Sequence, residues 1–283
     1  MRTCLFLLLL ALPTLATTAQ VNAPVDSVQT LTEIELADGS VFVGTVISES
    51  DTDLVIRTSA GTEVRVVKSQ IVSRKQIRGR VVGEAFRRFD PNDSRLFFAP
   101  TGRTLEQGSA YLTAYYIFFG FAAYGITDRV TLGGGTFLVP QAFGKLLYVA
   151  PKVQLIQVPG NSVSVGVLAG FAERETAGIA YAVWTKGQPD RSLTAGVGFA
   201  FGGGNFNSDP VIVLGGETRL GRRTKLVGEA YIAPTIGGGG LFMGGIRFFG
   251  RNIAADIGLL GFATEDGGVP AIPWVSFAYN FGR

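Results

Sequence analysis

A small set of charged residues in the second half of the chain could do chemistry. Three are carboxylates and three are cations, and they are Lys152, Glu217, Arg219, Glu229, Arg247 and Asp256. Carboxylates held close together can serve as general acid and base or as nucleophile. The same groups can instead neutralise one another, because buried charges need partners. Which role applies depends on the elements that carry them.

Other chemistries are excluded by residue type. The chain has no histidine, and its one cysteine, Cys4, falls in the first few residues. Ser-His and Cys-His nucleophile pairs, Cys or His metal sites and disulfides are therefore excluded from the mature chain. The Gly-rich runs 202–204 and 237–240 lack the lysine and helix of a phosphate-binding loop, so we interpret them as mobile extracellular loops. We predict no cofactor, no metal and no catalytic residue.

The first 19 residues are typical of a secretory signal peptide. Arg2 precedes the apolar run 4–12, Pro13 breaks that run, and small residues lead to an expected cleavage point after Ala19. The run is well short of the ~20 apolar residues that a spanning helix needs. We therefore expect export.

The composition favours β-structure in a membrane. Glycine contributes 39 of 283 residues, hydrophobic residues reach 47% and charged residues only 17%. No later apolar stretch reaches the length of a spanning helix. The formal net charge of +3 is small and spread along the chain, so we expect no nucleic-acid partner.

Residues 28–80 contain four or five short alternating runs separated by the turn signals Asp38-Gly39 and Ala60-Gly61. This spacing predicts a small SH3-like or Sm-like β-barrel. The pattern DGSVFVGTV…TSAGTEVRVV resembles modules at the front of many bacterial envelope proteins. We expect it to face the periplasm, where it could meet a partner of unknown type.

Residues 81–107 form a predicted connector. Pro91, Pro100 and Gly102 break regular structure there. The segment and its margins are rich in phenylalanine, which a floppy linker would not need. We therefore expect it to fold back on the periplasmic rim of the following domain.

From residue 108 to 283, segments of about nine to twelve residues alternate between apolar and small or polar side chains, as transmembrane β-strands do. Tight polar turns alternate with looser segments, and a further bend is expected near Phe119-Gly120. The count predicts an antiparallel barrel of about 12 strands with both ends in the periplasm. Its first hairpin, within residues 111–124, is the weakest part of the pattern.

The same alternation places the charged candidates in the lumen. In the last strand Phe277, Tyr279 and Phe281 share the outward face, opposite Ser276 and Asn280. Extended to the earlier strands, this parity directs all six charged candidates inward. Either an ion-pair network fills a closed barrel or the charges line a selective pore, and sequence does not separate the two at this strand number.

The run from Asn92 to Phe137, followed by PKV, LGGE and GGIRFFG, resembles an uncharacterised outer-membrane β-barrel family of Bacteroidetes-type bacteria. The resemblance covers the chain from about residue 92 onward. It implies the barrel and an outer-membrane location. No assigned activity or catalytic residue comes with it.

We therefore expect an outer-membrane barrel of structural, anchoring or passive-transport type, without catalysis. A solute-selective pore, a barrel-embedded carboxylate enzyme and a soluble β-sandwich remain alternatives. The expected partners are outer-membrane lipid and the barrel assembly machinery, which reads an aromatic-ended last strand such as the one that ends near Phe281.

Overall fold

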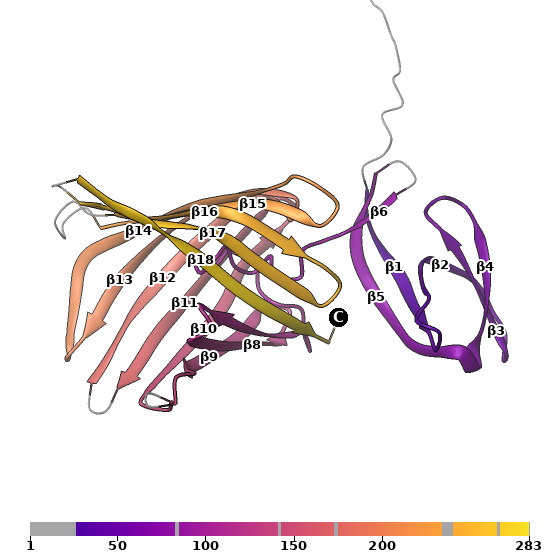
Figure 1. The fold of residues 1–283 in the computed structure, drawn as a ribbon, viewed down its shortest axis with the longest axis horizontal. Coiled ribbons are helices and arrows are strands. Elements are labelled where there is room, and N and C mark those ends of the chain that lie inside the picture. Colours follow the sequence, from indigo (N-terminus) through magenta and orange to yellow (C-terminus); the bar gives the residue numbers. More distant parts are fainter. Residues whose placement is uncertain are drawn as a thin grey trace, which may run out of the picture.

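The computed structural model describes residues 27–82, 85–140, 143–172, 175–233, 240–264 and 267–282. The expected leader, residues 1–19, lies outside this part of the chain. Two all-β units follow one another: a six-stranded sheet and a closed barrel of antiparallel strands (Figure 1).

The N-terminal sheet has the strand order β4-β3-β2-β1-β5-β6. Its elements are β1 (Ser27–Leu36), β2 (Val41–Glu49), β3 (Asp53–Thr58), β4 (Glu63–Val67), the 3₁₀ turn η1 (Lys68–Gln70), β5 (Ile71–Val82) and β6 (Ala85–Arg88). The core of this unit, which we call the module, consists of Ile34, Leu54, Ile56 and Val66. Gly39 and Gly61, both at φ +83°, make the two turns that the sequence predicts.

The module differs from the expected small barrel in two respects. It has six strands, because β5 runs on to Val82 and β6 from the expected connector pairs with it, Val82 opposite Ala85. Among the described strand pairs, β4 and β6 remain the two edges of the sheet.

The barrel closes in the order β10-β11-β12-β13-β14-β15-β16-β17-β18-β7-β8-β9, and every neighbouring pair is antiparallel. Its strands are β7 (Ala110–Tyr115), β8 (Phe119–Thr127), β9 (Val130–Phe137), β10 (Leu146–Val158), β11 (Asn161–Ala172), β12 (Glu175–Gln188), β13 (Arg191–Gly202), β14 (Asn205–Arg219), β15 (Thr224–Ile232), β16 (Gly240–Phe249), β17 (Ile253–Thr264) and β18 (Gly267–Phe281). The predicted twelve-stranded barrel is confirmed.

The alternation that predicted the barrel separates its two faces. On β18, Phe277 is 54% exposed, whereas the neighbouring Ala278 is 3% exposed. The same contrast holds on β17 between Ile257 and Asp256. Large apolar side chains therefore cover the outside of the barrel, as a hydrocarbon environment requires. No helix among the described residues is long and apolar enough to cross a membrane.

The turns at one end differ from the expected loops. β13 and β14 are joined by Gly203 and Gly204 alone, which have positive φ, so the expected loose segment 202–209 is a tight hairpin. The first hairpin turns at residues 116–118, not near Phe119-Gly120. Tyr116 and Ile117 take positive φ there, and neither residue type signals such a turn.

The position of the connector differs most from the prediction. Only the end of the segment lies at the rim as expected, where Thr104 and Gln107 contact Asp128 of the β8–β9 turn, and most of residues 89–107 do not. They pass into the barrel, where they hydrogen-bond to inward-facing side chains of many strands (Figure 1). We call residues 89–107 the plug. Its apolar side chains Leu96 and Phe97 are fully buried against Val227, Met243 and Trp274 of the wall, which explains the phenylalanine-rich sequence.

Candidate functional site: a plug held inside the barrel

The plug is an irregular segment with a tight turn at its tip. Arg95 and Pro100 form an isolated bridge, and the Leu96 amide donates to the Ala99 carbonyl over 2.8 Å. The backbone groups of such a turn must find partners when they enter an apolar enclosure. Charged side chains of the barrel wall supply those partners.

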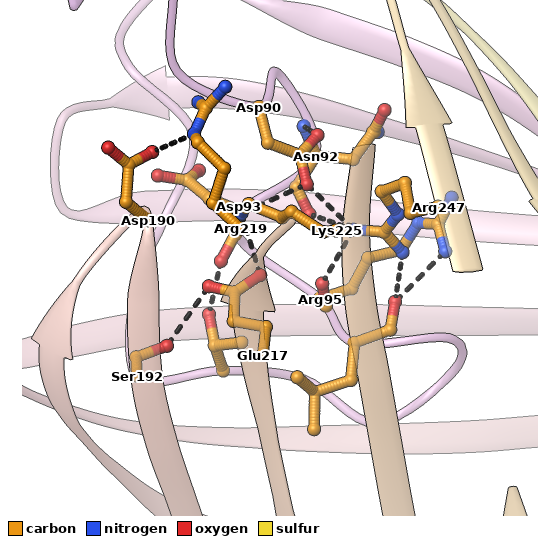
Figure 2. Close-up of polar contacts among 12 residues, drawn as sticks. Asp90, Asn92, Asp93, Arg95, Asp190, Ser192, Glu217, Arg219, Lys225 and Arg247 are labelled. Carbon is orange, nitrogen blue, oxygen red and sulfur yellow. Dashed lines mark hydrogen bonds and ion pairs between the residues drawn. The ribbon is translucent and has the colours of Figure 1, made fainter. Parts of the chain in front are cut away.

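Arg247, on β16, contacts the plug most extensively (Figure 2). Its guanidinium is fully buried and donates to the backbone carbonyls of Asn92, Arg95 and Leu96. Its Nε and Nη2 atoms bind the two carboxylate oxygens of Asp256, at 2.6 and 3.2 Å. One planar side chain thus holds three plug carbonyls and a wall carboxylate at once.

Lys225 connects the plug to a second carboxylate. Its ammonium lies 3.3 Å from Asp90 of the plug and 2.8 Å from Glu217 of β14, and all three side chains are fully buried. Glu217 also accepts hydrogen bonds from Arg103 of the plug and from Ser192. The cluster therefore alternates cations and anions across the boundary between plug and wall (Figure 2).

Asp90 is ionised in this cluster. Burial raises the pKa of its carboxyl, but the Lys225 ammonium, the Arg247 guanidinium and hydrogen bonds from Arg247 and the Asn92 amide together lower that pKa by more. The net result is a pKa well below the usual value of an aspartate.

Glu229 and Lys152 form hydrogen bonds with the backbone of the plug. Neither has a direct ion-pair partner among the described contacts. The Glu229 carboxylate accepts the amides of Phe98 and Ala99, at 3.2 and 3.1 Å. The Lys152 ammonium donates to the carbonyls of Ser94, Thr101 and Arg103. Each of these charges therefore fixes the shape of a plug turn.

Arg219 stands apart from this cluster, at the end where the module joins the barrel. It donates to Asp190 of the β12–β13 turn over 2.6 Å and to the Arg88 carbonyl at the end of β6. Its guanidinium also lies over the ring of Phe249. Arg219 thus positions the chain where it leaves the module and enters the barrel.

Glycines let plug and wall approach closely. A Cβ on Gly102 of the plug would lie 2.2 Å from the Ser162 carbonyl oxygen, and one on Gly215 of the wall would lie 2.3 Å from Leu96. Uncharged side chains surround the Gly102 backbone: Thr185 accepts its amide, and Ser164 and Gln154 donate to its carbonyl. The fit is therefore steric as well as electrostatic.

Five of the six charged residues that the sequence singled out contact the plug, all but Arg219, but several of their partners were missed. Lys225 could have been found, since it has the same parity on β15 as Glu229. Asp90, Arg95 and Arg103 belong to an irregular segment without periodicity, so no pattern marks them.

The carboxylates are poorly arranged for catalysis. Asp256 is bound by Arg247, Arg95 and Ser276. Glu217 is bound by Lys225 and Arg103, so both carboxylates are held by cations. Among the described residues, no group of three or more His, Cys, Asp or Glu side chains could hold a metal ion. The arrangement is suited to holding a segment in place.

Comparisons with known proteins place the chain in no family. No family model matches it, and no curated protein matches it. Three similar solved structures are forms of OmpT, an outer membrane protein of Vibrio cholerae.

The loop L8 deletion mutant of that protein is 13% identical, with a TM-score of 0.34, over 90% of this chain and 97% of that chain. The in-vitro folded trimer form is 12% identical, with a TM-score of 0.30, over 90% and 96%. The outer-membrane expressed form is 14% identical, with a TM-score of 0.29, over 90% and 97%. At such scores the likeness carries no argument about function, and the fold assignment rests on the strand pairing described above.

Proposed function

We propose that this protein is an outer-membrane β-barrel that is closed by its own plug and anchors its module at the periplasmic face, without catalysis. The observation that carries the proposal is the plug, residues 89–107. It is bound inside the lumen by β9 and β10 through Thr131 and Lys152, and by β15 and β16 through Glu229 and Arg247. A segment held from opposite parts of the wall obstructs the lumen.

Contacts between the module and the barrel support the anchoring role. Arg251, in the turn between β16 and β17, lies 2.6 Å from Glu33 and 2.8 Å from Glu35 of β1. Arg78 of β5 contacts Glu106 at the end of the plug. These ion pairs fix the module against the end of the barrel where both barrel termini lie, which in outer-membrane barrels is periplasmic.

The alternatives receive less support. In a charge-selective pore, Lys152, Glu217 and Arg247 would face a solute, whereas here they bind the plug. In a carboxylate enzyme, Glu229 would face a substrate, whereas here it binds backbone amides of the plug.

We also propose the finer assignments that the sequence suggests. These are membership of the Bacteroidetes-type outer-membrane family, an SH3-like or Sm-like module, insertion by the barrel assembly machinery, and a periplasmic partner of the module. The order β4-β3-β2-β1-β5, with η1 immediately before β5, supports the assignment of the module, to which β6 is an addition.

Planar-bilayer recording tests the closed barrel. The wild-type protein is expected to pass no steady current. A variant in which a Gly/Ser linker of equal length replaces residues 89–107 is expected to conduct, provided that it shows the heat-modifiable migration of a folded barrel. Equal steady conductance of the two proteins would refute the proposal.

A further inference from the structure

The plug does not fill the whole lumen. A cavity of about 130 Å³ remains beside its tip, between Phe98 and Pro100 of the plug and the inner faces of β7 to β15. Its walls are aromatic and aliphatic, and include Tyr148, Leu168, Ile179 and Tyr181. An apolar cavity of roughly 150 Å³ in another protein excludes water and binds benzene, so this space suits an apolar group of several carbon atoms.

The lining of the cavity covers several residues on individual strands. On β10 its lining extends from Tyr148 to Lys152, and on β12 from Ile179 to Val183. Four residue steps of a strand span about 13 Å at about 3.3 Å per residue.

The cavity has cationic side chains in its lining. Its charged lining residues are Arg95 and Lys152, and no aspartate or glutamate is among the described lining residues. The three described hydrogen bonds of the Lys152 ammonium go to plug carbonyls, so Lys152 contributes its field and no free donor.

Arg95 has an unused pair of donors. The side chain is 3% exposed, and its Nη1 atom donates to Asp256 and to the carbonyls of Leu96 and Phe97. Its Nε and Nη2 atoms have no hydrogen-bond partner among the described residues. On Arg247 the same two atoms bind both oxygens of a carboxylate. Arg95 therefore carries an unpaired fork of the kind that recognises carboxylates.

We propose that this cavity binds a single small alkyl carboxylate of about six carbon atoms. The carboxylate pairs with Nε and Nη2 of Arg95, and the chain lies against Tyr148, Leu168 and Tyr181. Both nitrogen atoms are shielded from solvent in the present structure. The rings of Tyr111 and Tyr115 lie 5.8 and 5.6 Å from the guanidinium carbon, so the carboxylate displaces a ring contact as it binds. An uncharged molecule of the same length would leave the fork unpaired and bind more weakly.

The second tryptophan of the chain offers a reporter. Trp274 is buried, does not line the cavity, and packs against Tyr115 with ring centroids 5.8 Å apart. Trp184→Phe removes the other tryptophan, which is exposed on the outer face. In that background the probe is 2-bromohexanoate, whose bromine quenches a nearby indole. Its methyl ester is the uncharged control, and unlabelled hexanoate is the competitor.

We expect saturable quenching of Trp274 that hexanoate reverses. Arg95→Gln should raise the half-saturating concentration about tenfold or more, and Leu168→Phe, which fills the cavity, should abolish saturation. Leu193→Phe, the same change on the exposed face of β13, should leave binding unchanged. Heat-modifiable migration verifies the barrel in each variant, and Leu168→Phe remains informative if Arg95→Gln does not fold.

Two results would overturn the assignment. Quenching that rises linearly with concentration in every variant would show partition into detergent only. Equal saturation by the acid and its methyl ester, with Arg95→Gln unaffected, would remove the carboxylate from the proposal. Neither result bears on closure of the barrel, which conductance measures separately.

Discussion

Arg247 illustrates how single side chains hold the plug. Its donors are divided between the Asp256 carboxylate and plug carbonyls. The same guanidinium therefore neutralises the charge of Asp256 and supplies hydrogen bonds to buried backbone carbonyls. Removing one member of a buried ion pair typically costs about 3–5 kcal/mol, because its partners stay buried without compensation. The plug therefore depends on this residue more than on any exposed ion pair.

We predict that Arg247→Gln loosens the plug while the barrel still forms. Gln cannot contact Asp256, Asp90 and the plug carbonyls together, so the variant should conduct in planar bilayers where the wild type does not. Arg223→Gln, an exposed arginine in the β14–β15 turn, is the matched control and should remain silent. A silent Arg247→Gln barrel would show that the hydrogen bonds of Arg247 are dispensable.

The charge of Asp90 leads to a prediction about pH. A depressed carboxyl pKa stabilises the folded state above the pKa of the unfolded chain, near 3.9, and that stability is lost as pH falls through the lower folded value. Asp90 is thus fully ionised at both pH 5 and pH 8. Asp90→Asn should lower the temperature of the heat-modifiable transition equally at both values. A difference between wild type and variant that vanishes at pH 5 would contradict this pairing.

Gly102 is expected to be a steric requirement of the plug. Since an added Cβ would lie 2.2 Å from the backbone oxygen of Ser162, Gly102→Ala should displace the plug and produce leak current. Gly244→Ala, at an exposed strand position with nothing within 4 Å, is the control and should behave as wild type. A Gly102→Ala barrel without leak current would mean that the plug can accommodate the added methyl group and remain in the lumen.

Among the elements of the fold, those with a regular alternation of apolar and polar residues could be predicted from the sequence. The two-residue alternation of β16, β17 and β18 separates exposed from buried positions and identifies the inward charges. The positions of turns could also be predicted where Asp or Gly occurs between strands, as at Gly39 and Gly61. The plug has no period, and several of its contacts join residues more than a hundred positions apart, so neither its path nor its partners could be predicted.

The first barrel hairpin shows why one turn was misplaced. Tyr116 and Ile117 have φ values of 50° and 67°, as in the type I′ turns that suit hairpins, but the usual residues there are Asn and Gly. A left-handed conformation costs an L residue roughly 1–2 kcal/mol. The turn is therefore imposed by the flanking strands and by the packing of Tyr116 on Trp274.

We predict that Ile117→Gly stabilises the barrel by about 1 kcal/mol, because glycine adopts positive φ without this cost. Ile117 is exposed, so little packing is lost. Denaturant unfolding in detergent would measure the change. Phe118→Gly, the next and equally exposed position without positive φ, should not stabilise. Stabilisation by both changes, or by neither, would contradict the assigned turn.

At the scale of the whole molecule, module, plug and barrel form one connected path. Arg219 binds the Arg88 carbonyl where the module ends, and Arg247 holds the plug a few residues later. Arg251 returns from the barrel to the first strand of the module. Composition and alternation could predict the two β units. The path of the plug inside the barrel depends on tertiary contacts that only the structure displays.

The position of the plug inside the lumen can be tested by cross-linking Leu96→Cys to Gly215→Cys, because the added Cβ at 215 would face Leu96 at close range. Cys4→Ser removes the chain's only other cysteine. In the folded, membrane-inserted protein we expect the pair to form a disulfide, seen as a reducible mobility shift. Leu96→Cys combined with Gly244→Cys, which lies on the exposed side of β16, should not form one. No cross-link at 215, or an equal cross-link at 244, would contradict a plug within the barrel.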